Sequence, residues 1–423
     1  MADLVFAFDA ALDHPLPVPE AAPPDVAATM SRAAAAALDE AAGIATAEQA
    51  AALVLCGRLL DPHRASPAQA AHLRTLVVSL ADRGCRTVVV AEDADACHEL
   101  SRMLGEPRGL SFVTPAAPLS FDVRGLAVEI ASAHGHATAA ATAVAGGPGP
   151  LQRRVVIGWD TAHWTPERRT DLPDFMHPAP PPTPAPVALF AAAAAASPAW
   201  SQPGTLLVWG SRDRQPMPPG VRHLSPLQPR SAAEASEGEC RLLSLVARDP
   251  DELPRAADAY ATPHADWRAT WQAAPTHRVV WQTVTVESPV GDDEELAATL
   301  WAALEKHAAV RQAPLVLARC AVACGTSVAR RVRIGEIAAE TLTRLRGLAA
   351  ASNASVWCRE LVAEPTESLA PLGHARSGGR PGTTTSFSSA LADIVTLVEQ
   401  SETLPPDQAR EAGWLALELI ESV

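Results

Sequence analysis

The sequence predicts an α/β protein, and the order of its apolar segments is the main reason. In the first hundred residues, short apolar runs alternate with longer Ala-rich helical stretches, which is typical of a largely parallel sheet flanked by helices. After Leu110 the apolar runs become short and closely spaced, which indicates an antiparallel part. A chain of 423 residues, 48% of them hydrophobic, is long enough to bury a core in two or three domains.

Three pairs of strand and helix are expected at the start of the chain. Pro24 before the first helix, and Ser66-Pro67 at the second, are typical helix-start signals. The strands are predicted at 4–8, 51–56 and 87–91, and the helices at 25–42, 66–83 and 95–104. Parallel strands of such a sheet end at one edge, where open α/β proteins bind their ligands.

The middle of the chain is predicted to continue as strands. They are expected at 110–113, 119–123, 126–131, 155–159, 187–192 and 205–209. The Pro-rich stretch 177–186 indicates an exposed polyproline-like loop, with a recognition motif as the alternative. We interpret 1–235 as the first domain and 236–277 as a connecting segment.

The region 278–365 is predicted to form a compact α+β domain. Its strands are expected at 279–286, 314–320 and 355–361, and its helices at 293–307 and 334–350. Gly, Ser, Pro and Thr dominate 366–385, which predicts a linker. Two helical segments in 386–423 close the chain.

Charge and cysteine usage narrow the class of protein. The formal net charge of −14 disfavours DNA binding by the chain alone, because phosphate contacts need Lys or Arg. Seven scattered cysteines argue against a secreted disulfide scaffold. The sequence has no signal-peptide pattern and no uncharged run of the roughly 18 to 20 residues that cross a membrane. We therefore expect a soluble, cytoplasmic protein.

The ends of the predicted strands have short motifs in a distinctive order. The first strand ends FAFDAALDHPL, the second LVLCGRLLDPHRAS and the third VVVAEDADA, followed later by VVIGWDTAHW, LLVWGSRDRQ and VRHLSPLQPRS. In order and spacing these motifs resemble those of SbcD/YhaO-type DNA-repair exonucleases, members of the calcineurin-like metallophosphoesterase superfamily. The resemblance implies a four-layer β-sandwich flanked by helices, with 278–365 as a small capping domain.

The same resemblance implies a dismantled two-metal site. Family members hold two divalent metals with strand-end carboxylates and histidines. Asp9 keeps the first carboxylate, but Arg58 stands where the family has its metal-bridging Asp. The other family positions, several of which hold histidines in the family, are occupied here by Ala11, Asp93, Ala94, Asp95, Asp160, Ser211 and Asp213. We therefore expect neither catalytic residues nor bound metal.

The chemistry of Arg58 is the main reason to expect no bound metal. A guanidinium stays protonated and has no lone pair to offer a cation. If Asp9, Asp93, Asp95, Asp160 and Asp213 converge, Arg58 could pair two or more of them in place of the metals, forming a structural salt-bridge cluster. Two alternatives stay open, namely that the acids bind one Mg²⁺ or Ca²⁺, or that Asp95 merely begins a helix.

The resemblance also implies a partner. Related proteins pair with SMC-like ATPases and commonly dimerise. We therefore expect a scaffold or regulatory subunit of an SbcC-type ATPase in DNA repair or defence, which forms a homodimer and touches DNA only within the complex. The apolar residues of the C-terminal helices suit docking into a groove, or packing on their own domain: Leu391, Ile394, Leu397, Trp414, Leu417 and Ile420.

Two other functions remain as alternatives. One is a divergent exonuclease or phosphodiesterase that uses Mn or Mg, and the other is a protein-interaction scaffold unrelated to DNA. Cys320 and Cys324 have no second ligand pair, which favours buried thiols over a zinc site. His134 and His136 suit a loop better than a metal pair, and the basic cluster 330–333 suits a phosphate contact or a solvated edge.

Overall fold

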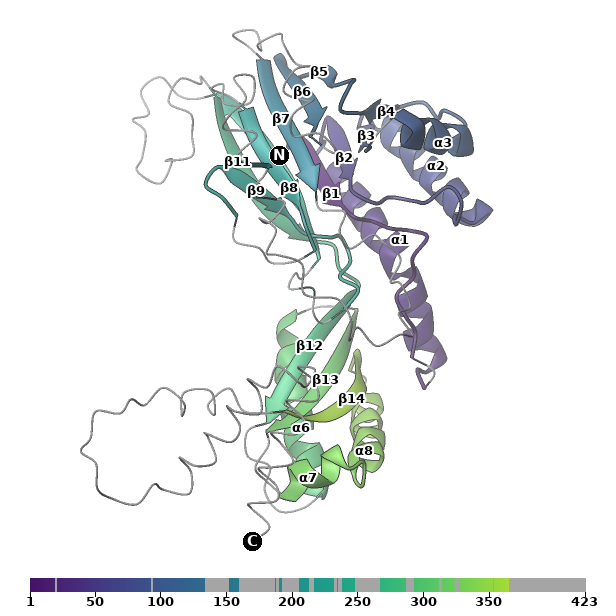
Figure 1. Cartoon of the computed structure of the whole chain (residues 1–423), viewed down its shortest axis with the longest axis vertical. Helices are drawn as coiled ribbons and strands as arrows, with labels where there is room; N and C mark the ends of the chain where they lie inside the picture. The colour runs from purple at the N-terminus through teal and green to yellow at the C-terminus, as the bar shows by residue number, and fades with distance from the viewer. Residues whose placement is uncertain are drawn as a thin grey trace, which may run out of the picture. The chain divides into compact units, whose positions relative to one another are not determined.

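The chain is a mixed α/β protein, as the sequence predicts, and its described part forms two compact units (Figure 1). The first holds the described residues up to Val280 together with 314 and 315, and the second holds the described residues that follow. The computed structural model describes residues 1–19, 21–92, 94–133, 152–159, 187, 190–191, 205–212, 217–231, 234, 238–247, 267–286, 293–311, 314–323, 327–352 and 354–364.

The first sheet of the first unit has six strands. Its order is β11-β10-β1-β2-β3-β4, in which β1 to β4 run parallel to one another and β10 runs antiparallel to both of its neighbours, β1 and β11. The strands are β1 (Leu4–Phe8), β2 (Ala52–Cys56), β3 (Arg86–Val90), β4 (Leu110–Val113), β10 (Glu239–Ala247) and β11 (Trp267–Pro275).

Strands β10 and β11 correct one domain boundary. The sequence analysis assigned 236–277 to a connecting segment, but both strands belong to the first sheet and β10 pairs directly with β1. Cys240, Leu243 and Leu245 are buried in this sheet, so the apolar residues of β10 contribute to the core. The first unit therefore extends to Val280.

Three helices cover one face of the first sheet (Figure 1). They are α1 (Pro24–Ala47), α2 (Pro67–Asp82) and α3 (Ala94–Leu104). Helix α2 begins with a capping box, in which the Ser66 hydroxyl accepts from the Gln69 amide and the Gln69 side chain accepts from the Ser66 amide. Alanines of α1 and leucines of α2 pack on Leu53 and Leu55 of β2, so the sheet is buried on this face.

The second sheet packs on the other face of the first. It has the order β5-β6-β7-β8-β9, and only β5 and β6 are antiparallel. Its strands are β5 (Leu119–Val123), β6 (Leu126–Ser132), β7 (Gln152–Trp159), β8 (Thr205–Gly210) and β9 (Val221–Leu224). Phe6 and Phe8 share one core with Val155 and Val208, which makes the first unit a sandwich of two sheets.

A predicted strand at 187–192 is wrong. The described residues there, Val187, Phe190 and Ala191, are helical. Val187 and Phe190 are three residues apart, so a helix turns both toward the outer face of the second sheet, where Phe190 lies 5.1 Å from Trp209 between ring centroids. In a helix, residues three apart such as Val187 and Phe190 lie on the same face, and the high alanine content of this segment favours a helix.

The second unit is a three-stranded sheet with helices. Its sheet has the order β12-β13-β14, and β13 and β14 are parallel. The elements are β12 (Val279–Val286), β13 (Leu315–Ala323), β14 (Val356–Glu364), α6 (Asp293–Arg311), α7 (Ser327–Arg333) and α8 (Ala338–Ala351). The helix predicted at 334–350 begins only at Ala338, because Gly335 adopts a positive φ of 80° in a turn that separates α7 from α8.

Several expectations fall outside the described residues. These are the Pro-rich loop at 177–186, the linker at 366–385, and the C-terminal helices with their proposed docking residues. Within the described part of the chain, no helix is long and apolar enough to cross a membrane.

Candidate functional site

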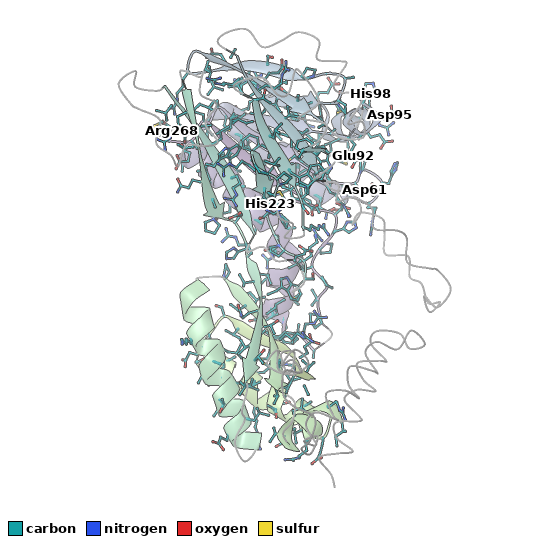
Figure 2. All side chains as sticks on the ribbon, turned by 60° about the vertical axis from the view of Figure 1, so that its left-hand side comes forward. Asp61, Glu92, Asp95, His98, His223 and Arg268 are labelled. Carbon is teal, nitrogen blue, oxygen red and sulfur yellow. The ribbon has the colours of Figure 1, made fainter. Side chains whose placement is uncertain are left out.

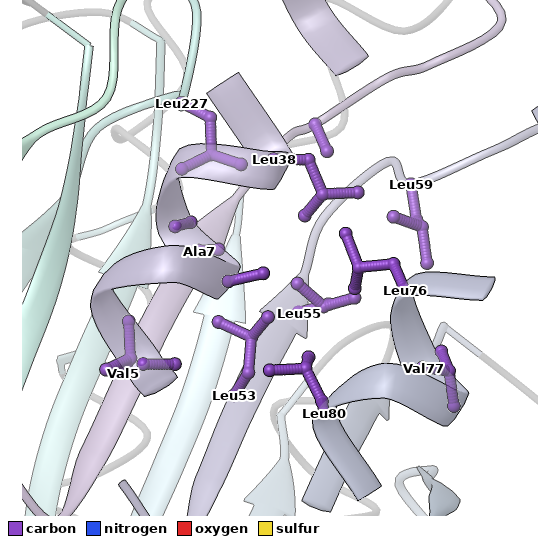
Figure 3. Close-up of a cluster of buried hydrophobic side chains, with 14 of the residues drawn as sticks. Val5, Ala7, Leu38, Leu53, Leu55, Leu59, Leu76, Val77, Leu80 and Leu227 are labelled. Atoms are coloured by element: carbon purple, nitrogen blue, oxygen red, sulfur yellow. The ribbon is translucent and has the colours of Figure 1, made fainter. Parts of the chain in front are cut away.

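The carboxyl ends of β1 and β2 are tied together by backbone hydrogen bonds. The amides of Asp9, Ala11 and Leu12 donate to the carbonyls of residues 56, 58 and 59, at 2.9, 2.8 and 2.9 Å. The amide of Leu227 donates to the Phe8 carbonyl at 2.9 Å, so the segment after β9 lies along the same strand end. Leu59 and Leu227 anchor these loops in the helix-side core (Figure 3).

The Phe8 ring requires two glycines at this junction. A Cβ on Gly57 would lie 2.5 Å from the ring, and a Cβ on Gly210 would lie 2.4 Å from it. Gly57 also has a φ of 75°, which side chains disfavour. Because Phe8 is buried between the sheets, these glycines let the ends of β1, β2 and β8 approach one another.

Asp9 is paired with an arginine from the middle of the chain, 203 residues away. Its carboxylate accepts from Arg212 Nε at 2.5 Å, and the Asp9 side chain is only 1% exposed. Arg212 Nη1 also lies 3.9 Å from the carboxylate of Glu234. Arg212 follows β8 directly, so the sandwich brings it to the end of β1.

Arg58 is paired with a different carboxylate. Its Nη2 donates to Asp13 at 3.0 Å, and the Asp13 side chain is fully buried. The same Nη2 contacts His14 Nε2, and Arg64 Nη1 lies 2.9 Å from that nitrogen. His14 Nδ1 lies 2.6 Å from the Asp13 carboxylate. Two guanidiniums, an imidazole and a carboxylate therefore form one connected network.

Arg230 completes the arrangement from the segment after β9. It donates to the carbonyls of Ala11, at 2.8 Å, and His14. Burial lowers the pKa of the Arg230 and Arg58 guanidiniums, and this shift is opposed mainly by Asp9 at Arg230 and by Asp13 at Arg58. Burial likewise raises the pKa of Glu234, opposed by Arg212. We call this set the arginine cluster: Asp9, Asp13, His14, Arg58, Arg64, Arg212, Arg230 and Glu234.

Three buried atoms of the arginine cluster make no hydrogen bond to any described residue. They are Asp9 Oδ1, Asp13 Oδ1 and Arg230 Nε. The backbone beside them is also unusual, because Asp9 and Ala11 have φ values of 52° and 42° in the left-handed region. Such strain in residues other than glycine persists only where the surroundings impose it, and it is frequent at binding sites.

The structure brings some of the sequence-predicted residues together and leaves others apart. Asp9, Ala11, Arg58 and Ser211 lie at the arginine cluster. Arg58 contacts Asp13, however, and the Asp9 carboxylate is paired with Arg212, so the predicted ion pair between Arg58 and Asp9 is not formed. Ala94 and Asp95 are exposed in the first turn of α3, where Asp95 lies near His98 (Figure 2). Asp93, Asp160 and Asp213 lie outside the described residues.

Sequence reasoning missed most of the arginine cluster. Asp13 and His14 stand within the quoted motif FAFDAALDHPL, and Arg212 and Arg230 stand within LLVWGSRDRQ and VRHLSPLQPRS. The available signal was an arginine two residues after the end of β2 and of β8, namely Arg58 and Arg212.

The donor set of the arginine cluster does not suit two divalent cations. Asp9 and Asp13 each accept a hydrogen bond from a guanidinium, which has no lone pair to offer a metal. Within the described ranges, no group of three or more His, Cys, Asp or Glu side chains is placed to hold a metal ion. The chemistry that this arrangement supports is ion pairing and the binding of acceptor groups by arginine.

Ala11→Gly is expected to stabilise the protein by about 0.5 to 1 kcal/mol, because glycine adopts a positive φ without the steric cost that alanine meets. Ala10→Gly is the matched control, since Ala10 does not have a positive φ. That change is expected to destabilise by a similar amount. Urea unfolding monitored by circular dichroism measures both. A destabilised Ala11→Gly variant would contradict the strain at this position.

Comparison with known proteins does not assign the chain to a family. No protein-family model matches the sequence, and no curated protein matches it as a relative. The class of protein is therefore defined by the fold and the site alone: an α/β sandwich whose strand ends are occupied by an arginine cluster.

Proposed function

We propose that this chain is a non-catalytic, phosphoesterase-like subunit that serves as a scaffold or regulatory partner of an SMC-like ATPase. The observation that supports the loss of catalysis is the pairing of Asp9 with Arg212. Asp9 stands for the first metal ligand in the resemblance to SbcD/YhaO-type exonucleases, and its carboxylate is held by a guanidinium at 2.5 Å. A two-metal mechanism needs that oxygen for a cation.

Arg58 supports the proposal independently. It stands where the resemblance implies a bridging carboxylate, and it is held by the fully buried Asp13 rather than turned to solvent. A fixed positive charge at the bridging position repels divalent metals. Phosphodiester hydrolysis would also need a proton donor for the leaving group, and the resemblance places Ala94 at the position of the catalytic histidine.

The partner is proposed from the resemblance and from charge. A chain with a net charge of −14 is a poor DNA binder alone, so a contact with DNA would depend on a second, basic subunit. Proteins of the resembled family pair with ATPases that have long coiled coils. The apolar residues of the C-terminal region, among them Leu391 and Trp414, suit helix-in-groove docking to such a subunit.

A single-metal phosphodiesterase is the second candidate. The observation that favours it is that Asp9 Oδ1 and Asp13 Oδ1 are buried without a hydrogen bond from the described residues. Carboxylate oxygens of this kind are the ligands that a hard cation takes, and neither of them is used by an arginine. DNA would then be cleaved in the presence of Mn²⁺ or Mg²⁺.

One experiment separates these two functions. The full chain, purified alone and with the coiled-coil ATPase encoded nearest to it, is analysed for manganese and assayed for cleavage of single- and double-stranded DNA. We expect co-purification with the ATPase, less than about one metal per ten chains, and no cleavage that depends on Asp9. Stoichiometric manganese, or cleavage abolished by EDTA and by Asp9→Ala, would refute the non-catalytic proposal. Failure to bind the ATPase would refute the partner.

A further inference from the structure

The arginine cluster contains more guanidiniums than carboxylates. Arg58, Arg64, Arg212 and Arg230 are four cations, whereas Asp9, Asp13 and Glu234 are three anions. The inner part is balanced, because Arg212 lies between Asp9 and Glu234 and Arg58 lies on Asp13. Among the described residues, neither Arg230 nor Arg64 has a carboxylate within salt-bridge distance, and Arg64 is the one at the exposed outer edge.

At the outer edge of the arginine cluster, two guanidinium groups contact the same imidazole nitrogen. Arg58 Nη2 and Arg64 Nη1 both contact His14 Nε2. A guanidinium can only donate, so Nε2 must be the acceptor and the ring proton must reside on Nδ1, facing the Asp13 carboxylate at 2.6 Å. Two like charges then share a single lone pair, and apart from the bond of Arg58 to Asp13 their remaining donors make no hydrogen bond to a described residue.

Solvent reaches this edge. Arg64 is exposed, and the side chains of Arg58 and His14 are 17% and 25% exposed. The backbone here is held by its own hydrogen bonds, since the Ala11 amide donates to the Arg58 carbonyl and the Gln69 side chain donates to the Leu12 carbonyl at 2.7 Å. The two guanidiniums are thus presented on a rigid frame, which lowers the entropy cost of binding a ligand between them.

We propose that Arg58 and Arg64 form an oxyanion site that takes a terminal phosphate group. A phosphate monoester offers several acceptor oxygens in place of the single Nε2 lone pair, and its negative charge relieves the repulsion between the two guanidiniums. The planar donor forks of arginine suit such an anion better than an ammonium group would. The inference rests on the proposed function, because it assigns the phosphate to arginines where an active phosphoesterase would use metals.

The test is binding of three phosphate probes in the presence of EDTA. The probes are inorganic phosphate, a deoxynucleoside 5′-monophosphate, and a 5′-phosphorylated oligonucleotide compared with its unphosphorylated form, at constant ionic strength. Calorimetry is expected to show saturable binding that Arg64→Ala weakens about tenfold. Equal affinity for the three would identify phosphate itself as the ligand, and tighter binding of the oligonucleotide would identify the end of a nucleic-acid strand.

Arg83→Ala is the matched control for charge. Arg83 is an exposed arginine just beyond the end of α2, a helix of 16 residues that separates it from Arg64 by roughly 24 Å. We expect this variant to bind like the original chain, and Arg64→Lys to bind less tightly because it lacks the fork. Equal losses in Arg64→Ala and Arg83→Ala, or no binding of any phosphate probe, would overturn the proposal. So would equal binding of the unphosphorylated oligonucleotide.

The metal and phosphate experiments fail independently. EDTA removes any metal ion that could bind phosphate, so phosphate binding measured in its presence depends on the arginines alone. A chain that contains manganese and cleaves DNA would refute the proposed function, whatever the result for Arg64. A chain that contains no metal and binds no phosphate probe would refute the phosphate site but not the proposed non-catalytic function.

Discussion

Replacing Arg212 with alanine is expected to destabilise the first unit by about 3 to 5 kcal/mol, the usual cost of leaving one partner of a buried ion pair alone. Asp9 is 1% exposed and Arg212 is 15% exposed, so water cannot take over the lost charge-assisted hydrogen bond. The second Asp9 oxygen already makes no hydrogen bond to a described residue, so the carboxylate would keep only its distant arginine neighbours. Replacing Arg212 with Thr, Ser or Leu should lower the free energy of unfolding as much as Arg212→Ala does, because none of these side chains restores the positive charge.

A double-mutant cycle measures this coupling. Denaturant unfolding of Arg212→Ala, Asp9→Ala and the combined variant should show that the combined change costs less than the two single changes added together, since the double variant buries no lone charge. Arg83→Ala serves as the exposed-arginine control and should change the free energy of unfolding by less than about 0.5 kcal/mol. Strict additivity in the cycle would contradict the pairing of Asp9 with Arg212.

Gly57→Ala is expected to cost about 2 to 4 kcal/mol, because two unfavourable effects coincide there. The new Cβ would lie 2.5 Å from the ring of Phe8, which is buried between the two sheets, and the residue must keep a φ of 75°. The ring cannot move aside freely, since a Cβ on Gly210 would meet the same ring at 2.4 Å. The damage should extend to the arginine cluster, because Gly57 directly precedes Arg58.

Gly84→Ala separates the two effects. Gly84 has a φ of 81° and nothing within 4 Å of its would-be Cβ, so it meets the backbone strain without the clash. Its expected cost is about 1 kcal/mol, and the difference between the two variants measures the contact with Phe8. Phe8→Leu should recover part of the loss in the Gly57→Ala background. If Gly57→Ala and Gly84→Ala cost the same, the contact with the Phe8 ring contributes nothing.

Predictions from the sequence were best where one local pattern was enough. The strands at the ends of which the site lies, β1 and β2, were predicted to within one residue, because short buried runs bounded by turn residues are distinctive. The start of α2 was predicted from Ser66-Pro67, and the structure has a complete capping box there. Errors arose where the pattern was ambiguous, as in the Ala-rich run from Val187, whose short apolar sequence also suits a helix.

Residue types alone indicated that a carboxylate follows the first strand and an arginine follows the second. Residue types could not indicate which side chains the Asp9 carboxylate and the Arg58 guanidinium would contact. Asp9 and Arg212 are 203 residues apart, and they meet only because two sheets stack and bring the end of β8 to the end of β1. Arg58 lies against Asp13 because two strand-end loops are held together by backbone hydrogen bonds. Local sequence decides which elements form, whereas contacts between charged groups depend on how those elements pack.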